Sequence, residues 1–146
     1  MAIDYVKKCQ DAAGRFKYTL DKTTGSNSLT GTGILSLQIW KNAKSQEAKK
    51  GLDYIVENRL FEDWKKVNVY EWYYHAQACF QSTGVGTSKY WREWNKNFQQ
   101  VVVKAQESDG HWPHGAHYHG DSDIYRTTMT ILMLEVYYRY APMTKV

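Results

Sequence analysis

The chain contains two kinds of apolar segment, which differ in how much of a helix circumference is apolar. The segments at 45–58 and 88–107 are amphipathic: apolar residues recur at helical spacing along one face, and charged residues occupy the other. A helix with one apolar stripe keeps its opposite side in water. Both segments are therefore predicted to be outer helices of a layered helical protein.

The second kind of segment, at 33–40, 69–80 and 124–140, is apolar or aromatic on most of its circumference. Helices of this composition are covered nearly all round or line a cavity. When the short opening segment 2–10 is taken as a first outer helix, the two kinds alternate along the chain. The sequence therefore predicts an all-α fold of three helical hairpins, with an inner and an outer layer, in a single domain spanning residues 1–146.

A pattern of Gln, three residues, Gly, one residue and an aromatic residue occurs twice between an outer helix and the inner helix that follows. The two copies are Gln10, Gly14, Phe16 and Gln106, Gly110, Trp112. The segment 54–64 occupies the equivalent place in the middle hairpin in degraded form. A Gln at a helix end can hydrogen-bond unpaired backbone groups, and Gly allows a left-handed turn over which the aromatic ring can pack. Two copies at matching places predict an internal repeat.

The second copy, preceded by "FQQVVVKA", resembles the QW repeat of the squalene/oxidosqualene cyclase and protein prenyltransferase superfamily. The last segment, "IYRTTMTILMLEVYYRYAP", resembles the final inner helix of bacterial proteins that carry such repeats. The resemblance implies an α/α toroid with concentric layers of helices. Three hairpins form an arc whose apolar flanks are bare at both ends. We therefore expect either missing N-terminal repeats of a longer protein or a homodimer to complete the toroid.

Composition and charge narrow the range of partners. The 146 residues include 19 Lys and Arg and 15 Asp and Glu, and the basic residues are scattered among acids, so no nucleic-acid partner is expected. No apolar run reaches the roughly 18 residues of a membrane span. Cys9 and Cys79 are too few for a disulfide framework and lack metal-site spacing. Aromatic residues make up 15% of the chain, which suits an aromatic core or an aromatic-lined cavity.

The catalytic signatures of the superfamily provide the first candidate for chemistry. Triterpene cyclases protonate their substrate with a DxDD acid at the start of an inner helix, and the sequence "DSDI" places Asp123 at its central position. Ile124 replaces the last Asp, and an Asp before a helix also serves as an N-cap. Asp123 is therefore a candidate acid by resemblance and a candidate cap by position. The Asp-x-Cys zinc pair of the prenyltransferases and the GCGEQ thioester signature are absent, and no cofactor is expected.

The loop after the second repeat copy is rich in histidine and is a candidate for ligand contact. His117 and His119, with Asp121, are suitable ligands for a transition metal, although no fixed helical spacing holds them together. Solvated or hydrogen-bonded loop histidines are the simpler interpretation. Polysaccharide lyases with an α/α toroid use His, Tyr and Arg, which makes Tyr118, His119, Tyr125 and Arg126 candidates for a sugar-facing site, although no motif ties them together.

The sequence "YEWYYH" at 70–75 is a third candidate. In a cyclase-like cavity its rings, including Tyr74 and His75, would stabilise cations. In a packed centre they would fill the space where the inner helices meet. We favour packing around a small polar pocket, because many Tyr hydroxyls need hydrogen-bond partners.

Three functional hypotheses follow from these residues. The leading one is a non-catalytic toroid-type module that binds a small molecule or a protein partner, because the catalytic signatures of the superfamily are missing. The second is a terpenoid-cyclase-like or prenyltransferase-like enzyme, or a fragment of one, with Asp123 as its acid. The third is a carbohydrate-active fragment. A fold alone does not select among them.

Overall fold

The computed structural model describes residues 2–41, 43–61, 63–82, 86–115 and 121–139. In chain order its elements are α1 (Ala2–Lys8), α2 (Asn27–Ile39), α3 (Gln46–Asn58), the 3-10 turn η1 (Trp64–Lys66), α4 (Val69–Phe80), α5 (Lys89–Ala105), α6 (Asp123–Leu134) and α7 (Val136–Arg139). The described residues form isolated β-bridges but no strand, which confirms the all-α prediction.

Four of these helices begin directly after a capping side chain. Ser45, Asn68, Ser88 and Ser122 each accept a hydrogen bond from the backbone N–H three residues further on. Such caps satisfy N–H groups that have no partner within the helix. The single helix expected at 124–140 is instead two helices. The hydrogen-bond pattern changes between α6 and α7: the N–H of Tyr138 donates to the carbonyl of Glu135, three residues earlier, where an α-helix would use a residue four earlier.

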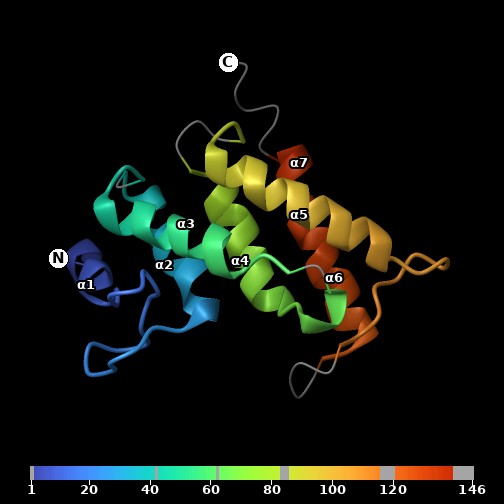
Figure 1. The fold of residues 1–146 in the computed structure, drawn as a ribbon, viewed down its shortest axis with the longest axis horizontal. Helices are drawn as coiled ribbons and strands as arrows, with labels where there is room; N and C mark the ends of the chain where they lie inside the picture. Colours follow the sequence, from blue (N-terminus) through green and yellow to red (C-terminus); the bar gives the residue numbers. More distant parts are fainter. Residues whose placement is uncertain (1, 42, 62, 83–85, 116–120, 140–146) are drawn as a thin grey trace.

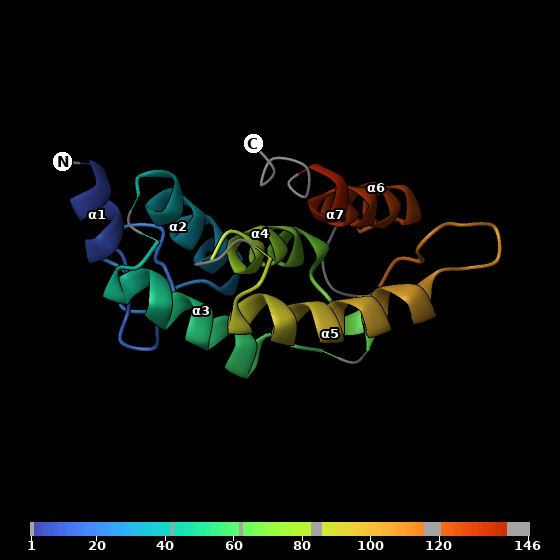
Figure 2. The same cartoon turned by 90° about the horizontal axis from the view of Figure 1, so that it is seen from above.

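The helices lie in two layers (Figures 1 and 2). Helices α3 and α5 are neighbours in one layer, and α4 lies between α2 and α6 in the other. In the second and third hairpins the chain therefore passes from one layer to the other, since α3 is followed by α4 and α5 by α6. Helix α1 contacts α2 and lies beside it (Figure 2). This arrangement gives α4 a neighbour on either side as well as the layer behind it.

Helix α4 is accordingly the most enclosed helix. Trp72 is fully buried, and its ring packs edge-on against that of Trp94 of α5, with centroids 5.1 Å apart. In contrast, Ile39 at the end of α2 is 77% exposed and Ile124 of α6 is 75% exposed. The sequence predicted that all three inner segments are covered nearly all round or line a cavity. Most of α4 is buried, whereas α2 and α6 each leave a large apolar side chain exposed, so nearly complete cover is wrong for these two helices.

The first repeat copy forms the N-terminal joint, residues 10–16, between α1 and α2. The side-chain amide of Gln10 donates to the carbonyl of Gly14 at 3.0 Å, and Gly14 has a φ of +101°. Phe16 is 3% exposed, and its backbone N–H points to the hydroxyl of Thr30 in α2 at 3.4 Å. The ring of Phe16 lies against Gly33, where a Cβ would come within 2.3 Å of it.

The second copy forms the C-terminal joint, residues 106–112, with the same plan. Gln106 donates to the carbonyl of Gly110 at 2.9 Å, and Gly110 has a φ of +92°. The backbone N–H of Trp112 donates to the hydroxyl of Thr127 in α6 at 3.0 Å. In both joints the Gln therefore closes its own loop, whereas the sequence suggested that it would bond to a helix end.

The middle joint does not follow this plan. Helix α3 ends at Asn58 and α4 begins at Val69, so the connection is shorter than the other two. Its aromatic residue, Trp64, donates from its indole N–H to the carbonyl of Pro113 at 2.7 Å. The middle joint therefore contacts the third hairpin and does not close a loop of its own.

Candidate binding groove

Helix α4 has two faces of different chemistry. Trp72, His75 and Cys79 are fully buried, and the rings of Trp72 and His75 contact Trp94 of α5. The opposite face carries Tyr73, Tyr74, Gln77 and Gln81, which follow one another at helical spacing. This second face looks away from α5 and towards α2, and it forms one wall of a groove.

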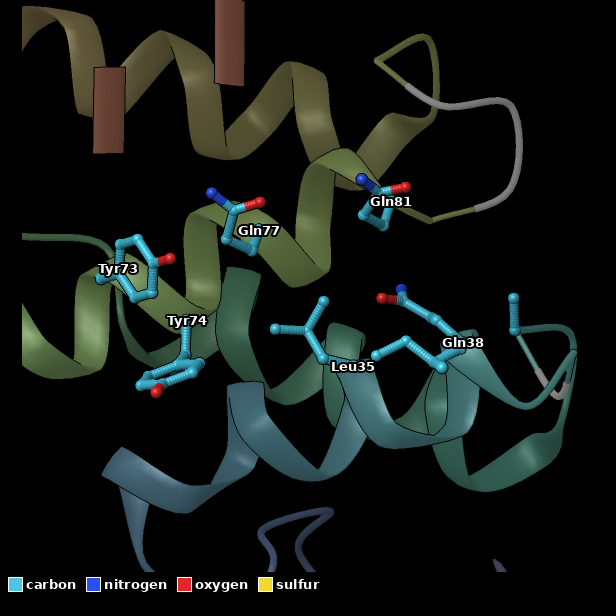
Figure 3. A pocket seen from close by; sticks show the side chains of 8 residues that line it. Leu35, Gln38, Tyr73, Tyr74, Gln77 and Gln81 are labelled. Carbon is cyan, nitrogen blue, oxygen red and sulfur yellow. The ribbon is translucent and has the colours of Figure 1, made fainter. Parts of the chain in front are cut away.

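The groove lies between α2 and α4 and has a volume of about 460 Å³ (Figure 3). Its lining consists of Leu35, Gln38, Ile39, Ala43, Tyr73, Tyr74, Gln77 and Gln81. No Asp, Glu, Lys or Arg is among these residues. A volume of 300–1,000 Å³ is typical of small-molecule sites. The site therefore offers amides, phenols and aliphatic groups, without a formal charge.

Close packing between α2 and α4 forms the floor of this groove. A Cβ at Gly31 of α2 would lie 2.6 Å from the backbone of Tyr74, so the helices can approach this closely only because Gly31 has no side chain. The amide of Gln38 donates to the carbonyl of Ala78 at 2.9 Å and joins the two helices. Its Oε1 atom is buried and has no hydrogen-bond partner among the described residues. An unpaired buried oxygen is unfavourable unless a further donor reaches it.

Tyr73 and Tyr74 of α4 line one end of the groove (Figure 3), and Tyr70 of the same helix packs against Tyr74. The ring of Tyr74 packs edge-on against Tyr70 and Tyr73, with centroid distances of 5.0 Å and 5.1 Å. Burial raises the pKa of Tyr70, and the neighbouring phenol of Tyr74 adds to this effect. The cluster is therefore an uncharged aromatic surface with hydroxyl groups at its edge.

The structure separates the two α4 residues that the sequence proposed as a pair. Tyr74 lies in the groove, but His75 is fully buried on the other side of the helix. Its Nε2 lies 3.1 Å from the carbonyl oxygen of Asn27, to which it donates. Burial lowers the pKa of His75 to about 3, so the ring is neutral at physiological pH. His75 is part of the core.

Asp121 and Arg126 form a buried ion pair at the start of α6. The guanidinium of Arg126 donates to both carboxylate oxygens of Asp121, at 2.9 Å and 3.0 Å from Nε, and both side chains are almost completely buried. It also donates to the carbonyl oxygens of Trp64 and Val67 at 2.8 Å each. These contacts tie the start of α6 to the middle joint, which leaves the guanidinium enclosed by protein groups.

Asp123 lies at the surface, at the first residue of α6. Ser122 is the N-cap, so the interpretation of Asp123 as the cap is wrong by one position. The carboxylate of Asp123 accepts from the backbone N–H of His114 at 2.6 Å and is 2.8 Å from the Nδ1 atom of that residue. The N–H of His114 lowers the pKa of Asp123, and its imidazole adds to this effect. An acid that donates a proton needs the opposite shift.

The remaining candidate residues do not form a second site within the described part of the chain. Tyr125 is partly buried against the hydrophobic core, while His117, Tyr118 and His119 lie outside the described residues. Among the described residues, no group of three His, Cys, Asp or Glu side chains could hold a metal ion. None of the helices described is both long enough and apolar enough to cross a membrane.

No protein-family model, curated protein or solved structure matches this chain. The groove must therefore be interpreted from its own chemistry. Sequence reasoning identified Tyr74 but missed Gln38, Gln77 and Gln81. A signal for two of them is present in the sequence, because Tyr73, Gln77 and Gln81 recur every four residues opposite the apolar positions of the same helix.

Proposed function

We propose that the chain is a non-catalytic binding module whose ligand site is the groove between α2 and α4. The observation that carries this proposal is the uncharged lining of amides and phenols on the face of α4 that looks away from α5. A concave site with a few polar groups among apolar ones is the usual form of a small-molecule site. The small polar pocket expected near Tyr74 agrees with this geometry.

The surroundings of the ionisable residues support binding in preference to catalysis. The candidate acid Asp123 is half-exposed, and hydrogen bonds from His114 favour its ionised form. The neutral imidazole of His75 is enclosed in the core and does not line the groove. Neither residue therefore has the position and the ionisation that an acid–base reaction in the groove would need.

We also propose that the three hairpins are consecutive repeats of a partial α/α toroid. The matching loops at the N-terminal and C-terminal joints support this proposal. Large apolar side chains are exposed near both ends of the row of hairpins, among them Tyr5, Leu20, Val103, Ile131 and Tyr138. Such surfaces favour association with a second copy or with further repeats. Light scattering at increasing protein concentration tests the second-copy form, and a monomer at all concentrations would exclude it.

The binding proposal is tested by NMR on the ¹⁵N-labelled chain with a library of small neutral and charged fragments. We expect the shifted resonances to cluster on Tyr73, Tyr74 and Gln77. Parallel incubations with squalene and farnesyl diphosphate are expected to give no product. Fragment hits that cluster on another surface would contradict the proposed site. Product formation that is lost in Asp123→Asn would support the cyclase-like alternative instead.

A further inference from the structure

We infer that the ligand of the α2/α4 groove is a neutral oligosaccharide, bound with its sugar rings against the tyrosines and its hydroxyl groups on the glutamines. This inference rests on the proposed function, because it names the class of ligand for the same groove. It is carried by three properties of the lining: the absence of charge, the density of amide groups and the packing of the tyrosine rings.

The absence of charge argues against anionic ligands. Phosphate and carboxylate groups are held in proteins by Arg and Lys, often through paired hydrogen bonds. The chain contains 19 Lys and Arg, and none of those that the structure describes lines the groove. A prenyl diphosphate or an acidic polysaccharide would therefore bring its charge to a site without a cation. The ligand that fits this lining carries no net charge.

The amide groups argue against a purely hydrocarbon ligand. Gln77 and Gln81 line one wall of the groove, and Gln38 projects from the other (Figure 3). An amide provides both donors and an acceptor. Gln38 already donates to the carbonyl of Ala78, and its buried Oε1 lacks a donor among the described residues, so a hydrocarbon chain would leave that oxygen unpaired. A sugar hydroxyl is both donor and acceptor, so it can pair with either end of an amide. The groove therefore matches a ligand that carries many hydroxyl groups.

The tyrosine cluster provides a surface for sugar rings but not a cage for a cation. The ring of Tyr74 packs edge-on against Tyr70 and against Tyr73, with centroids about 5 Å apart in each pair, so the edges of these rings meet and their faces do not converge on one point. A quaternary ammonium ion requires several ring faces directed at one point. An aromatic face is electron-rich and attracts polarised C–H groups. The C–H faces of sugar rings are such groups, since their carbons bear oxygen or nitrogen substituents.

The inference is tested by titrating the ¹⁵N-labelled chain with neutral hexasaccharides of glucose, xylose, mannose and N-acetylglucosamine. We expect at least one of them to shift the side-chain amide resonances of Gln38, Gln77 and Gln81 in a saturable way. Tyr74→Ala is expected to weaken this binding by about tenfold or more, and Gln77→Leu by a smaller factor. Tyr138→Ala serves as the control, because Tyr138 is 81% exposed and lies outside the groove.

Further probes separate a failure of the inference from a failure of the proposed function. Hexagalacturonate, farnesyl diphosphate, choline and a proline-rich peptide are titrated under the same conditions. If one of these shifts the groove resonances and no neutral hexasaccharide does, the oligosaccharide inference is overturned while the binding function stands. If no hexasaccharide binds, the inference is also overturned. If hexasaccharides bind but shift another surface, both are overturned. Tyr74→Phe keeps the ring and is expected to keep most of the affinity.

Discussion

The N-terminal and C-terminal joints share one loop but differ in what surrounds it. In each, a Gln side chain bonds to a carbonyl four residues later, a glycine adopts a positive φ, and a buried aromatic residue leads to a Thr of the next helix. The shared features are therefore local. They explain why the pattern recurs in the sequence at matching places.

The difference lies in the neighbouring outer helix. At the N-terminal joint Gln10 makes a second hydrogen bond, to the carbonyl of Glu47 in α3 at 2.8 Å. A Cβ at Gly14 would lie 2.7 Å from the carbonyl oxygen of Lys50, also in α3. At the C-terminal joint Gln106 is exposed, and the nearest atom to a Cβ at Gly110 is the amide nitrogen of Gln106 at 4.0 Å. The same loop thus joins two hairpins in the first case and closes only itself in the second.

The largest expected effect is the removal of the aromatic residues. Phe16→Ala and Trp112→Ala are each expected to lower the free energy of unfolding by about 3–5 kcal/mol, because both residues are nearly fully buried. Urea unfolding followed by circular dichroism measures both values. A loss below about 1 kcal/mol for either would show that its ring is not part of the core.

Smaller substitutions at the same two positions separate the hydrogen bond of one aromatic residue from the packing of the other; they are Trp112→Phe and Phe16→Leu. The indole N–H of Trp112 donates to the carbonyl of Val102 at 2.9 Å, in the last turn of α5. Trp112→Phe leaves that carbonyl unpaired and is expected to cost about 1–3 kcal/mol. Phe16 has no such bond to lose, so Phe16→Leu is expected to cost only what its packing contributes.

Glycine substitution separates the two joints more clearly. Gly14→Ala is expected to cost about 2–4 kcal/mol, because a positive φ strains an L-residue and the new Cβ collides with the backbone of Lys50. Gly110→Ala carries the strain alone, and a cost of about 1 kcal/mol is expected. Chemical unfolding of both variants tests the difference. Equal costs would mean that α3 does not pack against the N-terminal joint as described.

Much of the local structure could be predicted from the sequence. The two joints, the amphipathic α3 and α5, and the enclosure of α4 all follow from residue types at fixed spacing, since each depends on neighbours along the chain. The exposure of Ile39 and Ile124 did not follow. The apolar composition of a helix predicts that it can be buried, but it does not show whether a neighbouring helix covers each of its faces.

The candidate sites depended more on contacts distant in sequence. Arg126 looked like a ligand-facing residue, yet its guanidinium binds the carbonyl oxygens of Trp64 and Val67, about sixty residues away. The groove combines residues of α2 with residues of α4. Such pairings are set by the packing of whole helices, for which a single sequence carries no direct signal. His75 and Tyr74 are adjacent in sequence, and the packing of α5 against the side of α4 that carries His75 places only Tyr74 in the groove.

Substitution of the two joint glutamines is expected to give a smaller difference in the free energy of unfolding between the joints. Gln10→Ala removes two hydrogen bonds in a partly buried position and is expected to cost about 1–2 kcal/mol. Gln106→Ala removes one exposed hydrogen bond, and a cost of about 0.5 kcal/mol or less is expected. Thermal unfolding of the two variants under identical conditions provides the comparison. A larger loss of stability for Gln106→Ala than for Gln10→Ala would contradict the conclusion that α3 covers only the N-terminal joint.

The smallest expected effect concerns pH, which distinguishes the ion pairs of the two joints. Arg15 pairs with Asp11 at 3.0 Å in the N-terminal joint, whereas His111 occupies the matching position and pairs with Asp109 at 2.5 Å in the C-terminal joint. Arginine stays charged over the accessible pH range, but histidine does not. The hydrogen bond to Asp109 raises the pKa of His111 and lowers that of Asp109.

This ion pair therefore supports the C-terminal joint only in a window of pH. The contribution of His111 is complete below its unfolded pKa and is lost as the pH rises through the higher folded value, while that of Asp109 is lost as the pH falls through its lowered value. NMR titration is expected to give His111 a pKa above 6.5 that falls in Asp109→Asn. The resonances of the N-terminal joint should stay constant as the pH rises through the pKa of His111, because the matching ion pair there contains no histidine. A His111 pKa unaffected by Asp109→Asn would show that the two side chains do not interact in solution.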